Sequence, residues 1–454
     1  MIKLRLKTIA DFLDGRLIGA DAVIANVGID TRDLPEQAVY IALQGERLDG
    51  HDLIEQAEQA GAVALIVQRE VPSHLAQIVV QDTKLALAIL AGRVRDTVNP
   101  RVCAVTGSNG KTTIKEMLAS ILSQQHTVLA TQGNFNNEIG VPLTLLRLEP
   151  EHQFAVVEMG ANHEDEIAYT CRYAKPDVAI ISNVGLAHIE GFGCIEGVAS
   201  AKAEIIEALP DEGIAILNTD DTFFNLWRAI AGQRACLSFG LDTCADVRAE
   251  SITTVIENKL FMTRFSLVVN QEYFPVCLPL AGQHNVMNAL AATAASIALG
   301  IDIANIIHGL ESMQAVQGRM QLLQSVAGFH IINDSYNANP SSLQAALDVI
   351  SELSGEIWLA LGAFGELGAE CEVLHKEMGR NIKQAGVSRL FAVGEMAEYT
   401  VAAFGEGASY YQQQADLVQA IQTEIPNDGV LLVKGSRLQK MDVVVNQLLD
   451  RVKT

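Results

Sequence analysis

The sequence predicts an α/β protein with three domains: a small amino-terminal α/β domain, a central doubly wound sheet and a Rossmann-like carboxy-terminal domain. The chain has 454 residues, which is too many for a single hydrophobic core. From about residue 101 onward, short β-branched apolar runs alternate with stretches of helical periodicity, as in βαβ units. The alternation begins again after about residue 312, which predicts a second sheet of the same kind.

The amino-terminal domain is expected to cover residues 1–82. Within it, residues 38–45 and 62–68 are predicted strands, and residues 52–60 between them form a predicted helix. The sequence shows no internal repeat or low-complexity linker between the three domains.

The central domain is expected over residues 83–312. Its predicted strands are 101–107, 127–131, 154–160, 178–184 and 213–218. Apolar residues recur at spacings of three and four in its predicted helices, which are 111–125, 163–174 and 195–209. Residues 236–281 have a β-rich texture, so we expect an antiparallel flap there, followed by a helix over 284–299 that closes the domain.

The carboxy-terminal domain is expected over residues 313–454. Its predicted strands are 330–336, 356–364, 389–394, 409–412 and 429–436. Its first helix is clearly signalled, because Asn339 can cap it and Pro340 takes the first helical position, where a missing N–H costs nothing.

Composition restricts the possible functions. The formal net charge of −22 argues against a nucleic-acid binder, whose phosphate contacts normally require a basic surface. No apolar run is long enough to cross a membrane, and the charged start MIKLRLKTIADFLDGR is unlike a secretory signal. The seven cysteines are scattered, without pairs at metal or redox spacing. We expect a cytoplasmic protein with reduced cysteines and no membrane insertion.

The strongest motif is CAVTGSNGKTT at residues 103–113, where a strand runs through a glycine turn into a helix. The glycines let backbone N–H groups approach phosphate oxygens, the lysine adds a positive charge, and the threonine offers a hydroxyl to magnesium. The motif departs from G-x-x-x-x-G-K-[ST], since Val105 stands at the first glycine, and an ordinary strand-to-helix turn is the alternative. The candidate phosphate-binding residues are Gly107, Ser108, Asn109, Gly110, Lys111, Thr112 and Thr113. A sheet of the P-loop ATPase type is therefore predicted.

Glu158 and His188 follow later strands of the same predicted sheet, at the edge where doubly wound sheets bind ligands. Metal-assisted phosphate chemistry needs such groups, so we interpret both as magnesium ligands. A structural role for each residue is the alternative.

Lys202 is the most unusual position. It belongs to the apolar stripe of its predicted helix, whose members at spacings of four, three and four are Val198, Lys202, Ile205 and Leu209. A buried ammonium usually pairs or loses its proton. We therefore expect Lys202 to face inward, with a snorkelling lysine at the edge of the stripe as the alternative.

Several motifs, in this order and spacing, resemble the Mur ligase family over nearly the whole chain. They are GSNGKTT, NFNNEIGVPLT at 134–144, the glutamate of VVEMG, NVGLAHIEGFG, the lysine of ASAKAEI, GQHNVMNALAA at 282–292, DSYNANPSS at 334–342 and VKGSR at 433–437. In that family the phosphate loop has the same shortened glycine spacing. The resemblance implies an ATP-dependent ligase that activates a carboxylate as an acyl phosphate and couples it to an amine.

The resemblance also implies roles for particular residues. The catalytic residues would be Lys111, Glu158, His188 and Lys202. The lysine that matches Lys202 carries a carbamate in the family, which implies that magnesium is held by Thr112, Glu158, His188 and the modified Lys202. Beyond the phosphate loop, the implied ATP contacts are Asn285 and Asn288 on the adenine side, Arg319, and Asp334 from the carboxy-terminal domain.

NFNNEIG, DSYNANP and the amino-terminal IDTR…ALQGERLDGHD resemble the family member that adds a dipeptide. They imply UDP-N-acetylmuramoyl-tripeptide and D-alanyl-D-alanine as substrates, a role in peptidoglycan synthesis, and a monomer. The implied substrate contacts are Thr31, Arg32, Arg47, Asp49, His51, Asn134, Asn136, Asn137, Tyr336, Asn337, Asn339, Lys434, Ser436 and Arg437. Ala363 and Phe364 depart from the family, which usually has an acidic residue and a methionine there, whereas Glu366 still matches.

Three alternatives stay open. A sister ligase would add a single amino acid to the same nucleotide, and a folylpolyglutamate synthetase would add glutamate. DSYNANP is the segment that discriminates between these enzymes and the dipeptide ligase. A nucleotide-binding regulatory protein without ligase activity would leave KGSR and the inward-facing Lys202 unexplained.

Overall fold

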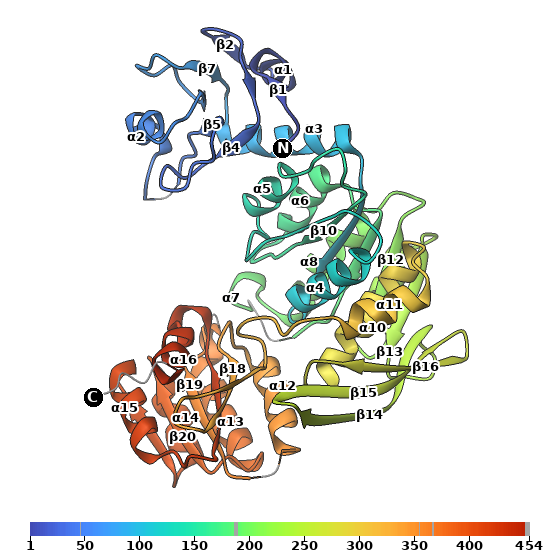
Figure 1. Cartoon of the computed structure of the whole chain (residues 1–454), viewed down its shortest axis with the longest axis vertical. Helices are drawn as coiled ribbons and strands as arrows, with labels where there is room; N and C mark the ends of the chain where they lie inside the picture. The colour runs from blue at the N-terminus through green and yellow to red at the C-terminus, as the bar shows by residue number, and fades with distance from the viewer. Residues whose placement is uncertain (46, 186–188, 354, 366, 450–454) are drawn as a thin grey trace.

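The computed structural model describes residues 1–45, 47–185, 189–353, 355–365 and 367–449. Figure 1 shows three successive bodies: an amino-terminal unit in blue, a central unit that runs from teal through green to yellow, and a carboxy-terminal unit in orange to red. The α/β class and the three-domain organisation predicted from the sequence are confirmed. The boundaries at residues 82 and 312 stay a prediction.

The amino-terminal unit is a mixed sheet with the strand order β2-β7-β6-β5-β4. Its strands are β2 (Arg16–Ile18), β4 (Asn26–Gly28), β5 (Ala38–Ile41), β6 (Ala64–Val67) and β7 (Ala76–Val79). A small pair and three helical segments complete it: β1 (Leu4–Arg5), β3 (Val23–Ile24), α1 (Leu6–Phe12), η1 (Gly50–Leu53) and α2 (Ile54–Gln59). The sequence predicted β5 and β6, which are buried along their whole length, but not the less buried strands around them.

The central sheet has the strand order β16-β15-β14-β13-β12-β11-β8-β10-β9. Its parallel part consists of β8 (Arg101–Thr106), β9 (Val128–Ala130), β10 (Phe154–Glu158), β11 (Val178–Ile181), β12 (Ile214–Asn218) and β13 (Ala235–Gly240). Because these strands are parallel, the residues that follow β8, β10, β11 and β12 lie along one edge of the sheet.

Helices cover both faces of this sheet, as doubly wound folds require. One face packs against α4 (Lys111–Leu122), α10 (Gln283–Ala298) and α11 (Ile303–Glu311). The other packs against α3 (Thr83–Val98), α5 (Gly140–Leu145), α6 (Glu166–Ala174), α8 (Ile195–Glu207) and α9 (Phe224–Ala231). Alternate residues of β8 belong to the two cores, Val102 to one and Cys103 to the other. The short helix α7 (Ile189–Phe192) precedes α8.

The predicted flap needs a correction at its start. β13 overlaps the start of residues 236–281 but pairs in parallel with β12, because that register buries Phe239 in the core beneath α10. The antiparallel part begins at β14 (Val247–Glu257) and continues through β15 (Leu260–Val269) and β16 (Glu272–Leu278) as an extension of the same sheet. Phe261, near the β14–β15 turn, is buried in the hydrophobic core of the carboxy-terminal unit.

The carboxy-terminal sheet has the strand order β17-β18-β22-β19-β20-β21. Its strands are β17 (Gln321–Gln324), β18 (His330–Asp334), β19 (Ile357–Gly362), β20 (Arg389–Val393), β21 (Ala408–Tyr411) and β22 (Val430–Lys434). All pair in parallel except β17, an edge strand that the sequence did not predict. The helical segments around it are α12 (Pro340–Ser351), η2 (Gly368–Glu370), α13 (Cys371–Gln384), α14 (Ala397–Phe404), α15 (Gln414–Glu424), η3 (Arg437–Gln439) and α16 (Met441–Leu449).

The predicted start of α12 is confirmed. The Asn339 side chain accepts a hydrogen bond from the Ser342 N–H, the Ser342 side chain accepts one from the Asn339 N–H, and Pro340 begins the helix. This capping box fixes the amino terminus of α12, which faces the central unit in Figure 1. No helix in the described ranges is long and apolar enough to cross a membrane.

Candidate active site

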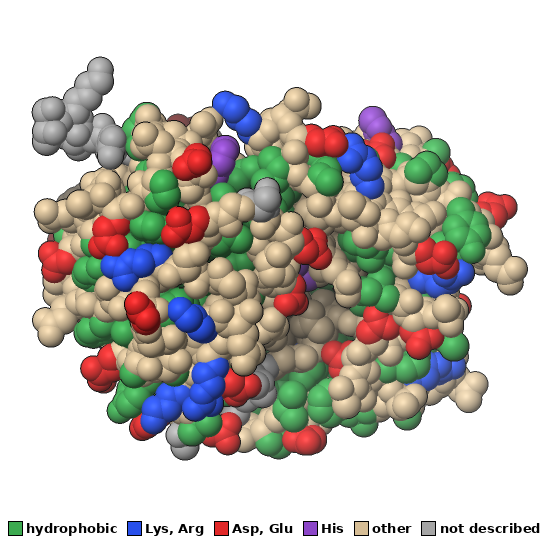
Figure 2. Space-filling model, turned by 90° about the horizontal axis from the view of Figure 1, so that it is seen from below, with side chains coloured by type: hydrophobic (Ala, Val, Ile, Leu, Met, Phe, Trp, Pro, Cys, Tyr) green, Lys and Arg blue, Asp and Glu red, His purple; other side chains and the backbone are tan. Residues whose placement is uncertain are grey.

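A cavity of about 720 Å³ lies between the ligand edge of the central sheet and the carboxy-terminal unit. Residues from the phosphate loop, β10, α8, α10, the start of α12 and the end of β22 line it. Seen from below, the molecule is hollowed between two lobes, and the lysines and arginines on this face are interspersed with acidic side chains (Figure 2).

The phosphate loop adopts a backbone that requires its two glycines. Gly110 has a φ of +84°, and a Cβ there would lie 2.2 Å from the Asn288 Oδ1. A Cβ on Gly107 would lie 1.8 Å from the Ser182 Oγ. Larger residues at either position would push the loop away from its neighbours, so the motif predicted from the sequence has the local structure that a phosphate loop needs.

Two residues that the sequence analysis missed hold this loop. Asn183 Oδ1 accepts from the Asn109 N–H at 3.0 Å, and the Ser182 hydroxyl donates to the Asn109 carbonyl at 2.6 Å. The Ser108 N–H also donates to the Asn183 carbonyl at 2.9 Å. The available signal was their position, since both follow directly after β11 at the ligand edge.

Lys111 lies against its own loop. Its Nζ donates to the carbonyls of Gly107 at 2.6 Å and Ser108 at 3.5 Å, and it forms no ion pair with a described carboxylate. Burial lowers the pKa of Lys111; the negative charge of Glu158 opposes this shift and the positive charge of Arg319 adds to it. A phosphate at this position would supply the missing anion.

Glu158 at the end of β10 is 3% exposed and only half satisfied. Its Oε1 accepts from the Asn136 amide at 2.8 Å, whereas Oε2 is buried and has no hydrogen-bond partner among the described residues. A buried carboxylate oxygen without a partner is costly, so this arrangement suits a cation. His188 and Glu366 lie outside the described residues.

Lys202 faces inward, as its periodicity predicted. It is 2% exposed on α8, it lines the cavity, and its Nζ makes no hydrogen bond or ion pair with the residues that the structure describes. Burial, together with the positive charge of Lys111, lowers its pKa to about 7 against the opposing effect of Glu204. A substantial fraction of the amine is therefore uncharged near neutral pH.

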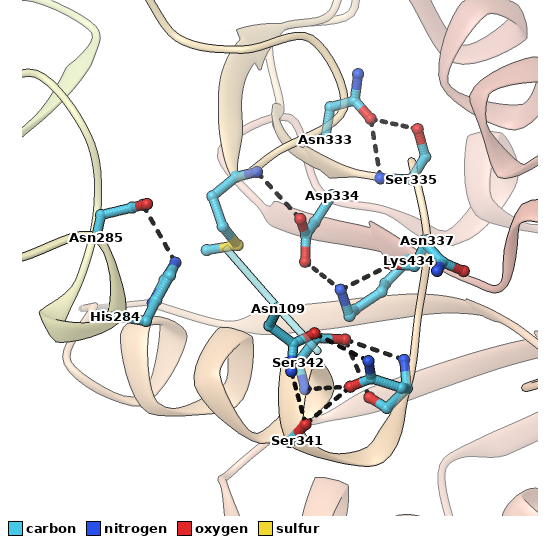
Figure 3. A network of polar contacts seen from close by, with 12 residues as sticks. Asn109, His284, Asn285, Asn333, Asp334, Ser335, Asn337, Ser341, Ser342 and Lys434 are labelled. Carbon is cyan, nitrogen blue, oxygen red and sulfur yellow. Dashed lines mark hydrogen bonds and ion pairs between the residues drawn. The ribbon is translucent and has the colours of Figure 1, made fainter. Parts of the chain in front are cut away.

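The carboxy-terminal unit presents a buried ion pair at the cavity. Asp334 at the end of β18 accepts from Lys434 Nζ at 2.5 Å, and from the Met320 N–H at 3.2 Å (Figure 3). Lys434 also donates to the Asn337 carbonyl at 3.1 Å. The ion pair links β18 to β22. Asp334 therefore already has protein partners, whereas the sequence predicted only a contact with the nucleotide.

The start of α12 contacts the phosphate loop directly. The Asn109 amide donates to the Ser341 hydroxyl at 2.9 Å and accepts from the Asn339 amide at 2.9 Å (Figure 3). The Ser341 hydroxyl donates in turn to Asn339 Oδ1 at 2.9 Å. Ser341 was missed, although it stands two residues after the predicted cap. The central and carboxy-terminal units are thereby joined at the centre of the site.

Two asparagines on consecutive turns of α10 form another wall. Asn288 donates to Asn285 Oδ1 at 3.1 Å, and Asn285 donates to the Ala281 carbonyl at 2.8 Å. His284, which the sequence analysis did not select, lines the cavity beside them, and burial lowers its pKa.

The position where the chain departs from the family motif is also close to the site. Ala363 is buried, and its carbonyl accepts from the Ser436 hydroxyl at 2.8 Å. The Phe364 N–H donates to the buried His375 ring at 3.3 Å. These bonds hold the segment after β19 without an acidic side chain.

The structure brings most of the predicted residues to one cavity. Those that line it are Ser108, Asn109, Gly110, Lys111, Thr112, Thr113, Asn136, Asn137, Glu158, Lys202, Asn285, Asn288, Arg319, Asp334, Tyr336, Asn337, Asn339, Lys434, Ser436 and Arg437. Gly107 packs against Ser182 and does not line the cavity, and Asn134 is exposed outside it.

The predicted residues of the amino-terminal unit do not line this cavity. Arg32 pairs with Asp30 at 2.6 Å, and the Thr31 hydroxyl lies 3.5 Å from the Gln56 side chain. The remaining ones are Arg47, which is exposed, and the bonded pair Asp49 and His51, whose Oδ1 and Nδ1 are 2.6 Å apart. His51 is buried and accepts from the Gln68 N–H at 2.9 Å, so it also organises its own loop.

Three family models match the chain in sequence order. They are the Mur ligase family catalytic domain over residues 23–126, the Mur ligase middle domain over 105–296, and the Mur ligase glutamate ligase domain over 318–437. Together they extend across all three sheets.

Relatives match over the full length. The chain is 42% identical to UDP-N-acetylmuramoyl-tripeptide–D-alanyl-D-alanine ligase from Escherichia coli strain K12, with 99% of each chain covered. A crystal structure of MurF from Acinetobacter baumannii has a TM-score of 0.92 at 36% identity, covering 98% of this chain and 99% of the other. MurF from Thermotoga maritima in complex with ADP has a TM-score of 0.82 at 28% identity, covering 93% and 96%.

Two of the alternative enzymes are similar in fold alone. A UDP-N-acetylmuramoyl-L-alanyl-D-glutamate–2,6-diaminopimelate ligase has a TM-score of 0.55 at 19% identity, covering 99% of both chains. Folylpolyglutamate synthase from Mycobacterium tuberculosis has a TM-score of 0.62 at 13% identity, covering 81% of this chain and 96% of the other.

Proposed function

The chain belongs to the Mur ligase family, and from that premise we propose that it joins D-alanyl-D-alanine to the terminal carboxylate of UDP-N-acetylmuramoyl-tripeptide. It is an ATP-dependent ligase that forms an amide bond, and its product is the pentapeptide precursor of peptidoglycan. The observation that carries the proposal is the cavity in which the phosphate loop of the central unit faces the DSYNANP and KGSR segments of the carboxy-terminal unit.

The reaction has two steps. A carboxylate oxygen of the tripeptide attacks the γ-phosphorus of ATP, the bond to ADP breaks, and an acyl phosphate forms. The amine of D-alanyl-D-alanine then attacks the acyl carbon, phosphate leaves with that oxygen, and the nitrogen loses a proton as the amide forms. Positioning and charge stabilisation supply most of the rate acceleration in such transfers, on the order of 7–11 kcal/mol for well-held reactants.

The nucleotide would lie along the ligand edge of the central sheet. Lys111 and the loop N–H groups at residues 107–113 would bind the phosphates, with Arg319 beside them and the asparagines 285 and 288 on the adenine side. The contacts of Lys111 support this assignment, because among the described residues its Nζ bonds only to neutral loop carbonyls, so its charge has no anionic partner until a phosphate binds. Asp334 would contact the nucleotide once Lys434, its ion-pair partner, also interacts with an anionic group of the substrate.

We further propose that magnesium is held by Thr112, Glu158, His188 and a carbamylated Lys202. The unpartnered Glu158 Oε2 and the low-pKa amine of Lys202 fit this role. Magnesium usually takes one or two carboxylates from a protein and relies on substrate phosphates for other ligands, which matches a site built around Glu158 and a carbamate. When bound, magnesium supplies positive charge that neutralises the transferring phosphate.

The substrates would meet between the units. We assign the UDP-sugar to the amino-terminal domain (residues 1–82), ATP to the central domain (83–312) and the dipeptide to the carboxy-terminal domain (313–454). Asn136 and Asn137 line the cavity from the central unit, where the peptide carboxylate would enter. We also expect a cytoplasmic location, since ATP and a UDP-linked precursor are cytoplasmic substrates. We further expect a monomer.

An acceptor panel tests the function. ADP release is measured with UDP-N-acetylmuramoyl-tripeptide and, in turn, D-alanyl-D-alanine, D-glutamate, diaminopimelate or L-glutamate. We expect rapid release only with the dipeptide. Comparable release with a single amino acid would favour a sister ligase, and release that does not depend on the carboxylate substrate would favour a regulatory nucleotide-binding protein.

A further inference from the structure

Tyr336 lies within cation–π distance of two arginines from separate segments. The Arg319 Cζ lies 4.3 Å from the centroid of the Tyr336 ring, and the Arg437 Cζ lies 5.2 Å from it. Both distances are within the reach of about 6 Å for a cation–π interaction. Arg319 precedes β17, Tyr336 follows β18, and Arg437 begins η3 after β22, so the ring connects three segments at the cavity.

Backbone contacts hold the ring between these segments. The Tyr336 N–H donates to the Gly318 carbonyl at 3.1 Å. Gly318 has a φ of +73°, and a Cβ there would lie 3.3 Å from both the Cβ and the N of Tyr336. On the other side, the Arg437 N–H donates to Asn337 Oδ1 at 3.1 Å. Hydrogen bonds therefore join the segment that carries the Tyr336 ring to the two segments that carry the arginines.

The two arginines face different parts of the site. Arg319 donates from Nη2 to the Thr112 hydroxyl in the phosphate loop at 3.0 Å, and its Nε is buried without a partner among the described residues. Arg437 is exposed on the carboxy-terminal side of the cavity. The Tyr336 ring thus contacts a guanidinium on the ATP side and another on the side assigned to the dipeptide.

We propose that Tyr336 is a positioning residue whose ring face orients Arg319 toward the ATP phosphates and Arg437 toward the dipeptide carboxylate. This proposal rests on the proposed function. The Tyr336 hydroxyl makes no hydrogen bond with a described residue, so the ring is the part in contact. Two guanidinium groups repel each other. The negative face of the ring offsets this repulsion in the free protein, before the anionic substrates bind.

The test compares Tyr336→Leu, which removes the ring, with Tyr336→Phe, which keeps it. The affinity for ADP is measured by calorimetry and the KM for D-alanyl-D-alanine by phosphate release. Tyr336→Leu should weaken both by about 5- to 30-fold, and Tyr336→Phe should restore most of that loss. Thermal unfolding checks the fold, and Tyr336→Met replaces the leucine variant if the latter does not fold.

Double-variant cycles separate positioning from direct contact. Once the ring is gone, Arg319→Lys should cost much less ADP affinity than it does in the wild type, and Arg437→Lys should behave likewise for the dipeptide KM. Tyr399→Leu is the matched control, because Tyr399 forms a cation–π contact with Lys376 at 5.3 Å outside the cavity. It should change neither constant.

Two results would overturn the proposal. One is a Tyr336→Phe variant as impaired as Tyr336→Leu, which would place the action in the hydroxyl. The other is additive losses in both cycles. If the wild type does not use D-alanyl-D-alanine at all, the proposed function fails, yet the ADP measurements with Arg319→Lys still decide the role of Tyr336.

Discussion

Lys202 and Arg319 both line the cavity, but different parts of the fold place them there. The helical periodicity around Lys202 was enough to predict its burial, because a single helix has one inward face. The contact between Arg319 and Thr112 was not predictable, because it joins residues far apart in sequence through the packing of two units. For the same reason, Ser182 and Asn183 were missed as supports of the phosphate loop.

Lys202 should make the protein less stable near neutral pH. Burial lowers its folded-state pKa from 10.5 to about 7, so below pH 7 the folded state carries a buried charge, and above pH 10.5 neither state does. In buffer free of carbon dioxide, Lys202→Met should therefore raise the free energy of unfolding below pH 7 by roughly 2–5 kcal/mol. The gain should shrink as the pH rises through this window. Urea unfolding across pH measures it, and a gain independent of pH would contradict the assigned pKa.

The proposed carbamate makes a separate prediction for the same residue. Lys202→Ala should lose at least about 10²-fold in kcat and regain part of it with added short carboxylic acids, which can present two oxygens to magnesium in the vacated space. Lys202→Arg should not be rescued, because guanidinium stays protonated. Steady-state phosphate release is the measurement. Full activity of Lys202→Arg would show that no carbamate is needed.

Secondary-structure elements were predictable where local signals and burial agree. The strands β8, β10, β11 and β12 are long apolar runs and were predicted, as was the capped start of α12. The strands β1 to β4, β7 and β17 were not, since each is very short or only partly buried and therefore lacks a continuous apolar run. The placement of β13 depended on its partner β12, which lies beyond the reach of a local pattern.

The α12 cap serves both the helix and the phosphate loop, and two variants of Asn339 should separate these roles. Asn339→Ala loses the acceptor for the Ser342 N–H and should cost about 1 kcal/mol of stability as well as activity. Asn339→Asp keeps that acceptor but places a carboxylate against Asn109 Oδ1, where the amide now donates. It should remain as stable as the wild type yet lose about tenfold or more in kcat/KM. Urea unfolding and initial rates measure the two effects, and an active Asn339→Asp would contradict a role for this contact.

At the scale of the whole molecule, the site is built between units. The phosphate loop was predictable from one segment, but its contact with Asn339 and Ser341 arises only when the carboxy-terminal unit lies against the central one. The β14–β15 hairpin adds a second contact, because Phe261 is 3% exposed within the carboxy-terminal core. No pattern within the hairpin distinguishes this phenylalanine from one that packs in its own sheet.

Phe261 should therefore help to hold the two units together. Phe261→Ala should cost about 3 kcal/mol of stability and increase the radius of gyration in small-angle X-ray scattering, since a buried aromatic side chain is lost between the units. The neighbouring Leu260→Ala is the control, because Leu260 is 51% exposed and should change little. An unchanged radius of gyration and an unchanged stability in Phe261→Ala would show that the hairpin does not join the units.

The fate of one oxygen atom tests the central claim, namely activation of the tripeptide as an acyl phosphate. UDP-N-acetylmuramoyl-tripeptide is labelled with a heavy oxygen isotope in its terminal carboxylate and incubated with ATP and D-alanyl-D-alanine. The phosphate released is then analysed by mass spectrometry. We expect each phosphate to carry one oxygen from the carboxylate, in step with pentapeptide formation. Unlabelled phosphate, or phosphate formed without the amide, would contradict the account.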